Sequence, residues 1–375
     1  MTEDATPVPA TPMPPWLATQ RDALLAQRGH AWLLVGPSGL GQYDLALSLV
    51  QAWLCEAQPQ AVDPALGAGP DMLGDAQETA ATPAKAEQGY TSYQPACGQC
   101  PSCHMLATRA HPDVAVLMPE TLMLELGWPL AEKAQKDIDD KKRKPSKEIR
   151  VDAMREMIEF AQLTSGRGRG LAVLVYPAER MNNITANALL KTLEEPSGKL
   201  KFVLATDAAH QLLPTIRSRC QTFALRWPQP GQTAEWLQSQ APEKTSPATL
   251  DAALLAAGGR PFDALAALTD GRAALWARLP HAVANGNVAA FADLSVQTAL
   301  DAMQKLCHDL WATKLGAMPR FFAAADLPKA PPARALSAWS EQLKSLARGI
   351  DHTWKADLLL EDLVSQGRLA LHSKS

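Results

Sequence analysis

Four cysteines have the residue type and the spacing of a metal site. Cys97, Cys100 and Cys103 are separated by two residues each, and Cys55 precedes them across the segment 56–96. Thiolates bind Zn²⁺ at about 2.3 Å, and a loop that returns to a helix end can complete a tetrahedron. The pattern predicts a zinc site made of these four cysteines, structural rather than catalytic because protein atoms fill every position.

Other ligand sets are open for these cysteines. The long segment before Cys97 makes Cys55 the least secure ligand, and His104 and His111 are the alternatives. An iron–sulfur cluster is disfavoured because no fourth cysteine follows Cys103 at the required spacing. Buried free thiols are also disfavoured, since three cysteines stand so close together.

A second chemical pattern is the glycine-rich run GPSGLGQY, which follows an apolar stretch ending at Val35. Gly36 and Gly41 have the spacing of a phosphate-binding P-loop, G-x-x-x-x-G-K-[ST], between a strand and a helix. Gln42 replaces the lysine and carries no charge to set against phosphates. Tyr43 replaces the short hydroxyl that reaches Mg²⁺, and its phenol is too long. The loop is therefore a degenerate P-loop.

The acidic Mg²⁺ ligand of such sites is also missing. It should follow the apolar run 171–175, where the sequence has Tyr176 and Pro177 and the first acid is Glu179. Because two parts of the site are lost together, we expect no ATP bound in cis and no hydrolysis. An active ATPase with a divergent P-loop is the alternative, and Mg²⁺-dependent ATP binding by the isolated chain would support it.

Two charged groups lie near apolar runs further along. Arg219 belongs to the turn TIRSRC, which is either a solvated basic loop or a source of a charge-stabilising arginine for another subunit. Glu194 and Glu195 end an expected helix before Pro196, where acidic groups oppose the helix dipole. This placement hints at an interaction, although a solvated helix end is the default interpretation.

The elements that must position these residues alternate between strands and helices. Such alternation predicts an α/β fold with a mostly parallel sheet. Helices are expected between the apolar runs and throughout the chain after about residue 228. The apolar runs expected to form strands are 30–35, 114–117, 171–176, 202–206 and 223–227, with a further short strand at Ile149.

Length and composition limit the number of domains and the class of protein. A chain of 375 residues predicts two or three domains. The net charge of −3 does not indicate a general nucleic-acid binder, which also disfavours a zinc-dependent DNA-binding module. The sequence has no run of 18 apolar residues, which argues against a membrane span. It also has no secretory signal pattern, so we expect a cytoplasmic protein. Cysteines there are metal ligands more often than disulfides.

Together these patterns resemble the delta-prime subunits of bacterial replicative clamp loaders, a family within the AAA+ superfamily. The resemblance covers about residues 16–375. Its motifs are the degenerate P-loop after His30, the cysteine cluster, the run NALLKTLEEP ending at Pro196, and the S-R-C motif at 218–220.

The resemblance implies a RecA-like AAA+ parallel sheet with helices on both faces, then a helical lid and an all-α collar. The boundaries expected are a disordered tail at 1–15, the AAA+ module at 16–227 with insertions at about 56–95 and 120–148, the lid at 228–275 and the collar at 276–375. In the lid, Phe262 takes the position of an arginine that contacts the γ-phosphate in cis.

The resemblance also implies partners. Arg219 would reach ATP bound by an adjacent tau/gamma subunit in a pentameric ring with delta. Through the complex the chain would act on the sliding beta clamp and primer–template DNA. No catalysis of its own is expected, although the whole assembly is a DNA-directed DNA polymerase.

Overall fold

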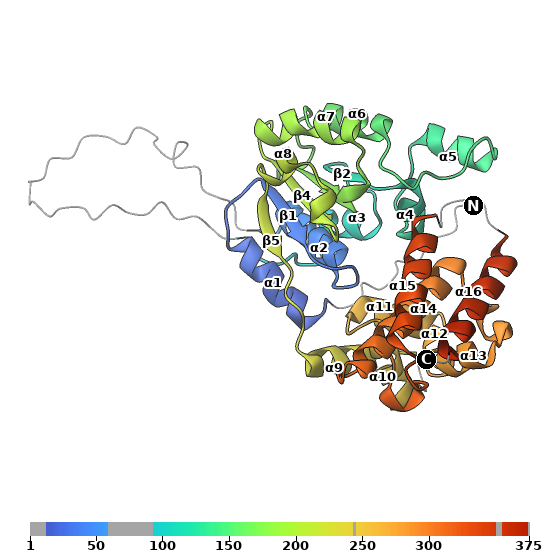
Figure 1. Cartoon of the computed structure of the whole chain (residues 1–375). Coiled ribbons are helices and arrows are strands. Elements are labelled where there is room, and N and C mark those ends of the chain that lie inside the picture. The colour runs from blue at the N-terminus through green and yellow to red at the C-terminus, as the bar shows by residue number, and fades with distance from the viewer. Residues whose placement is uncertain (1–12, 59–92, 243–244, 350–354, 374–375) are drawn as a thin grey trace, which may run out of the picture. The chain divides into compact units, whose positions relative to one another are not determined.

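The computed structural model describes residues 13–58, 93–242, 245–349 and 355–373 (Figure 1). The chain divides into two compact units, one ending at Arg226 and the other beginning at Trp227, with Ser38–Leu40 belonging to the second. The predicted tail at 1–15, except for its last three residues, and most of the predicted insertion at 56–95 lie outside the described residues.

The first unit is built on a parallel sheet of five described strands in the order β2-β3-β4-β1-β5. Its strands are β1 (Ala31–Val35), β2 (Val114–Leu117), β3 (Leu171–Val175), β4 (Leu200–Thr206) and β5 (Gln221–Ala224). Its helices are α1 (Pro15–Leu25), α2 (Gln42–Leu54), α3 (Pro101–Ala107), α4 (Glu120–Glu125), α5 (Glu132–Asp139), α6 (Val151–Phe160), α7 (Asn183–Glu194) and α8 (Pro214–Arg217).

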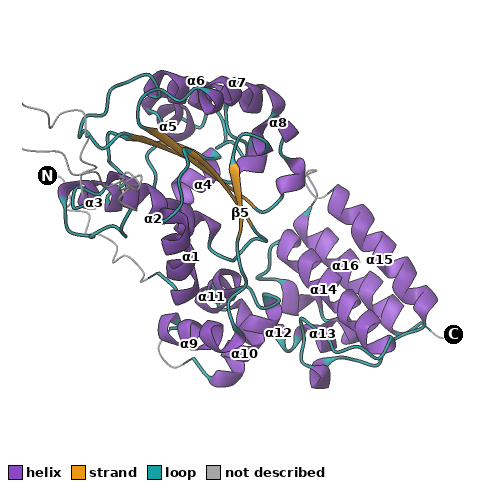
Figure 2. Ribbon diagram, turned by 90° about the vertical axis from the view of Figure 1, so that its left-hand side faces the viewer, coloured by secondary structure: helices purple, strands orange, loops and turns teal. Residues whose placement is uncertain are grey.

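Helices cover both faces of this sheet (Figure 2). Leu33, Val173 and Phe202 belong to one buried cluster with side chains of α6 and α7. Successive strand residues point to opposite faces, so their neighbours in the sequence face the side where α2 packs on β3 and β4. Strands buried on both faces read as continuous apolar runs, and β3 is buried throughout. The predicted α/β class, a RecA-like parallel sheet with helices on both faces, is confirmed.

Two strand predictions were wrong. The last strand is Gln221–Ala224 rather than 223–227, because β5 pairs only with β1 at the sheet edge, where polar residues such as Gln221 stay exposed. Ile149 makes a single bridge to Met181 and no strand, and α6 begins two residues later. Asn182 caps α7, and its side-chain oxygen accepts a hydrogen bond from Thr185 N.

The segment 120–148 is an ordered hairpin containing α4 and α5. Glu120 ties its base: the buried carboxylate accepts from Arg143 at 2.8 Å and from Ser146 N at 2.8 Å. Burial opposes ionisation of Glu120, but these donors outweigh it and lower the pKa of the carboxyl. These bonds join the two ends of the segment to each other.

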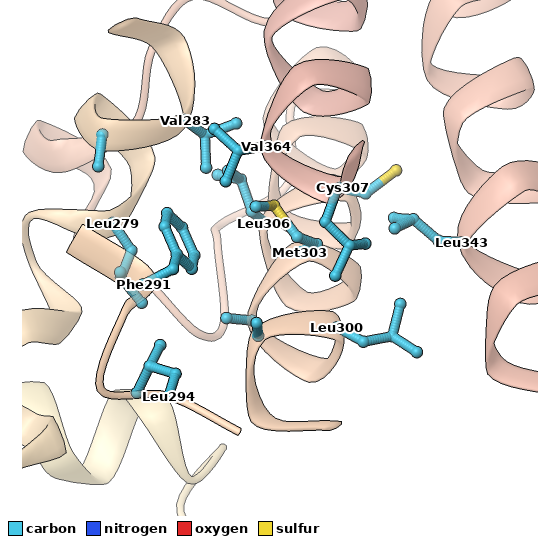
Figure 3. Close-up of a cluster of buried hydrophobic side chains, with 14 of the residues drawn as sticks. Leu279, Val283, Phe291, Leu294, Leu300, Met303, Leu306, Cys307, Leu343 and Val364 are labelled. Carbon is cyan, nitrogen blue, oxygen red and sulfur yellow. The ribbon is translucent and has the colours of Figure 1, made fainter. Parts of the chain in front are cut away.

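The second unit is helical. Its helices are α9 (Pro230–Gln240), α10 (Pro247–Ala256), α11 (Pro261–Thr269), α12 (Arg272–Trp276), α13 (Leu279–Asn285), α14 (Val296–Lys314), α15 (Ala333–Arg348) and α16 (Ala356–Leu371). Leu300, Met303 and Leu306 on α14 pack in a core with Phe291 and Leu343 (Figure 3). The boundary between lid and collar near residue 275 stays a prediction. Among the described helices none has the length and apolarity to cross a membrane.

Candidate functional site

The four predicted cysteines come together at the junction of α2 and α3. Cys55 immediately follows α2, Cys100 caps the N-terminus of α3, and Cys103 lies in its first turn. The sulfur atoms lie within 4.8 Å of one another, and the Cys55–Cys100 and Cys97–Cys103 distances are both 3.9 Å. These distances are too long for disulfides, whose sulfurs lie about 2.05 Å apart.

The geometry suits a tetrahedral metal. Zn–S bonds of about 2.3 Å place sulfurs about 3.8 Å apart on a tetrahedron, close to the observed 3.9 Å. Backbone N–H groups of Gln99 and Cys100 point at the Cys97 sulfur and lower the pKa of that thiol to about 6, which favours the thiolate. Four cysteines that can hold a metal are thus present, as predicted, and zinc itself stays a prediction.

The glycines of the degenerate P-loop serve the turn into α2. Gly41 has φ of 93°, a conformation that side-chain-bearing residues avoid, and it caps the helix. Gln42 is 2% exposed, and its amide donates to the carbonyl oxygens of Gly36 and Pro37, each at 2.7 Å. The amide at the lysine position is therefore hydrogen-bonded to its own loop.

Aromatic side chains from three separate segments meet beside the degenerate P-loop. Tyr43 accepts a hydrogen bond from Trp128 Nε1 at 2.8 Å, and its ring lies 5.6 Å from that of Tyr176. Burial raises the pKa of Tyr43. The Arg109 guanidinium, just beyond α3, lies 4.8 Å from the centre of the Trp128 ring. We name Tyr43, Trp128 and Tyr176 the aromatic cluster. Tyr43 and Tyr176 stand at the two positions where a nucleotide site would have its Mg²⁺-binding groups.

Two carboxyl groups close in sequence to members of this cluster have pKa values above the ordinary range. Glu179 accepts from Thr206 Oγ1 at 2.5 Å, and burial, with a hydrogen bond to Asp207, raises the pKa of Glu179 to about 7. Burial also raises the pKa of Asp44 to about 6. Such carboxyls are weak substitutes for the fully ionised acid that a nucleotide-bound Mg²⁺ requires.

Arg219 lies after α8, beside the end of α7. Its Nε donates to Glu194 Oε1 at 2.6 Å, and its Nη1 donates to the Thr215 carbonyl at 2.9 Å. The two side chains are 31% and 47% exposed, and together with His30 and Ser218 they line an open surface hollow. The arginine is therefore at the surface and already paired within its own chain.

Comparisons with known proteins place these features in a family. The family model described as "DNA polymerase III, delta subunit" matches residues 67–229. The DNA polymerase III subunit delta' of Pseudomonas aeruginosa is 34% identical over 64% of this chain and 56% of its own length. That of Escherichia coli is 31% identical over 67% of this chain and 60% of its own length. The resemblance to DNA polymerase III delta-prime subunits is thus confirmed over about two thirds of this chain.

The chain spans a little over half of the length of the delta-prime relatives it matches. Among solved structures, a DNA polymerase III gamma subunit-related protein from Thermotoga maritima aligns with a TM-score of 0.45 and 15% identity, covering 94% of this chain and 98% of that chain.

The polar side chains that hold the four cysteines in place were not predicted from the sequence. Glu56 accepts hydrogen bonds from Ser102 Oγ and from Arg167 Nε, both at 2.7 Å. Asp113 accepts from Gly166 N at 2.7 Å and so fixes the turn that carries Arg167. The signal in the sequence is the glycine- and arginine-rich run GRGRG at 166–170, which carries Arg167.

The alternative ligands stand apart from the cluster. His104 is exposed on α3, and buried His111 accepts from Asp113 N through Nδ1 at 3.1 Å. In the second unit, Phe262 packs against the Trp236 ring at 5.1 Å and provides no charge at the position where the resemblance implies an arginine.

Proposed function

We propose that this chain is a clamp-loader delta-prime subunit that does not hydrolyse ATP and assists a neighbour that does. In the cytoplasm it would join tau/gamma and delta subunits in a pentameric ring that loads the sliding beta clamp onto primed DNA. Its own contribution would be Arg219, placed in trans against the γ-phosphate of ATP held by the adjacent tau/gamma subunit.

The single observation that supports the proposal is the set of contacts that Gln42 and Tyr43 make within the chain. Gln42 is bonded to the loop carbonyls, and Tyr43 is bonded to Trp128 and packed on Tyr176. ATP hydrolysis needs a cation on the phosphates and a bound Mg²⁺, and neither an amide nor an aromatic cluster supplies them. A chain that keeps this fold without its nucleotide chemistry is suited to a supporting position in a ring.

Arg219 has the properties required for action in trans. A guanidinium is always charged and presents a fork of donors that matches phosphate oxygens. Arg219 lies on the surface, where another subunit can reach it. In systems where such an arginine is supplied by a partner, it raises the rate by about 10³–10⁵.

The cysteine cluster would hold a structural Zn²⁺. Its four ligands come from α2, α3 and the segment before α3, so the ion would join the helix of the degenerate P-loop to the module that follows. A metal bound by four protein ligands has no open position for chemistry. The zinc would therefore support the shape of the first unit.

The test is a reconstituted ring with Arg219→Ala. We expect the ring to assemble and its DNA-stimulated ATPase to fall by the share of the site next to this chain, since that one site loses its charge-stabilising group. Arg217→Ala removes an exposed arginine from the same turn and should leave the ATPase unchanged. Unchanged ATPase in the Arg219 variant would reject the role, and Mg²⁺-dependent ATP binding by the isolated chain would favour the active-ATPase alternative.

A further inference from the structure

We propose that Glu194 is a built-in competitor for Arg219, and that a neighbour's phosphate must displace it before the arginine can act. This inference rests on the proposed function in trans. It assigns a regulatory part to a residue that the sequence showed only as an acid at an unfavourable helix end.

The first observation is that all three guanidinium nitrogens already have partners within the chain. Nε donates to Glu194 Oε1 at 2.6 Å, and Nη2 donates to the same oxygen. Nη1 donates to the carbonyl oxygen of Thr215 at 2.9 Å and is 3.4 Å from Ser218 Oγ. The Nε–Nη2 edge, which can grip an oxyanion with two parallel N–H groups, is thus occupied by a carboxylate.

The second observation is that α7 fixes the position of the competing carboxylate. Glu194 is the last residue of α7, and the buried Leu193 precedes it. His30 Nε2 donates to the Leu193 carbonyl at 3.0 Å and so satisfies one of the free carbonyls at the helix end. The backbone that carries Glu194 is therefore anchored, while the carboxylate itself is about half exposed.

The third observation is electrostatic. A carboxylate at a helix C-terminus is repelled by the free carbonyl groups there, so Glu194 is unfavourable for α7 taken alone. The positive charge of Arg219 compensates this repulsion. When the arginine leaves, the repulsion returns, and this favours a return of the arginine once the phosphate is gone.

These contacts define an exchange between two acceptors. In the free subunit Arg219 is held by Glu194, and in the ring it would be held by the neighbour's γ-phosphate. Both acceptors need the same N–H groups, so they exclude one another. An exposed ion pair is weak, and its removal should therefore shift the balance by about two- to fivefold rather than by orders of magnitude.

The experiment measures two quantities. The first is the affinity of the full-length chain for its tau/gamma neighbour in the presence of a nonhydrolysable ATP analogue. The second is the ATP concentration at which the reconstituted ring reaches half of its maximal DNA-stimulated ATPase rate. Glu194→Gln keeps the size of the side chain but removes its charge. We expect association two- to fivefold tighter and half-maximal DNA-stimulated ATPase at a correspondingly lower ATP concentration. Glu194→Ala should act in the same direction, and Glu195→Gln, at the next exposed position, should change neither value.

The Arg219→Ala background separates this inference from the proposed function. There, Glu194→Gln should have no effect, because the carboxylate acts only through the arginine. Weaker or unchanged association in both Glu194 variants, with Arg219→Ala still defective, would overturn the competition and leave the role in trans intact. No effect of Arg219→Ala would overturn the proposed function itself.

Discussion

The hydrogen bond between Tyr43 and Trp128 provides a direct test of the contacts that Tyr43 makes within the chain. Tyr43→Phe removes only the hydroxyl oxygen that accepts from Trp128 Nε1 at 2.8 Å. Trp128→Phe removes the donor and leaves an aromatic ring in the same place. Because the two side chains are 9% and 6% exposed, water cannot readily replace the missing partner in either variant.

The expected magnitude follows from this burial. A buried donor or acceptor left without a partner costs about 1–3 kcal/mol, so each single variant should lose that amount of unfolding free energy. Trp128→Phe should lose somewhat more because a smaller ring also leaves a packing defect. The double variant has neither unpaired group, so its loss should be smaller than the sum by about 1 kcal/mol.

The assay is urea unfolding of the full chain, monitored by far-ultraviolet circular dichroism. The midpoint reports stability, and an unchanged slope shows that the same surface is exposed on unfolding. Trp227→Phe is the control, since that side chain is 47% exposed and its replacement should change stability by less than about 0.5 kcal/mol.

Two results would refute the reasoning. The first is a Tyr43→Phe variant as stable as the original chain, which would mean that the hydroxyl has no buried partner. The second is additivity of the two single variants, which would mean that the hydroxyl and the indole do not interact. Either result would remove the aromatic cluster as the reason for excluding nucleotide in cis.

Two further predictions concern the metal and the pH dependence. A chelator should remove about one Zn²⁺ per chain, measured with a colorimetric reagent, and should lower the Tm, since metal-binding energy is folding energy. Cys100→Ser should have a lower metal content and a lower Tm for the same reason. An unchanged metal content in this variant would contradict the four-cysteine site. Asp44 and Glu179 should contribute stability that is present at about pH 4 and lost by about pH 7 to 8, because their pKa values, raised by burial to about 6 and about 7, exceed the unfolded values of about 3.9 and 4.3, so these two groups bind more protons in the folded state over this interval. Asp44→Asn and Glu179→Gln should each remove one of these losses and make the slope of Tm against pH more positive, and a slope unchanged in both would contradict the assignment.

Local patterns in the sequence determined the chemistry that we predict for this chain. The spacing of the cysteines defined the group that can hold a metal, and the structure brings all four together. The residue types at 42 and 43 predicted the loss of nucleotide chemistry from the motif alone. Buried apolar runs predicted the parallel sheet. The two errors were at Ile149, which is buried but makes only a single bridge, and at β5, an edge strand with mostly exposed residues.

The tertiary structure alone decided which side chains meet. Trp128 comes from a segment with no recognisable motif, yet it packs on Tyr43, 85 residues away. Glu194 and Arg219, 25 residues apart, became a pair only when the end of α7 met the turn after α8. Residue type and spacing fix what a group can bind, because those properties are local. The partner that a group finds depends on how distant elements pack, and no single stretch of sequence contains that information.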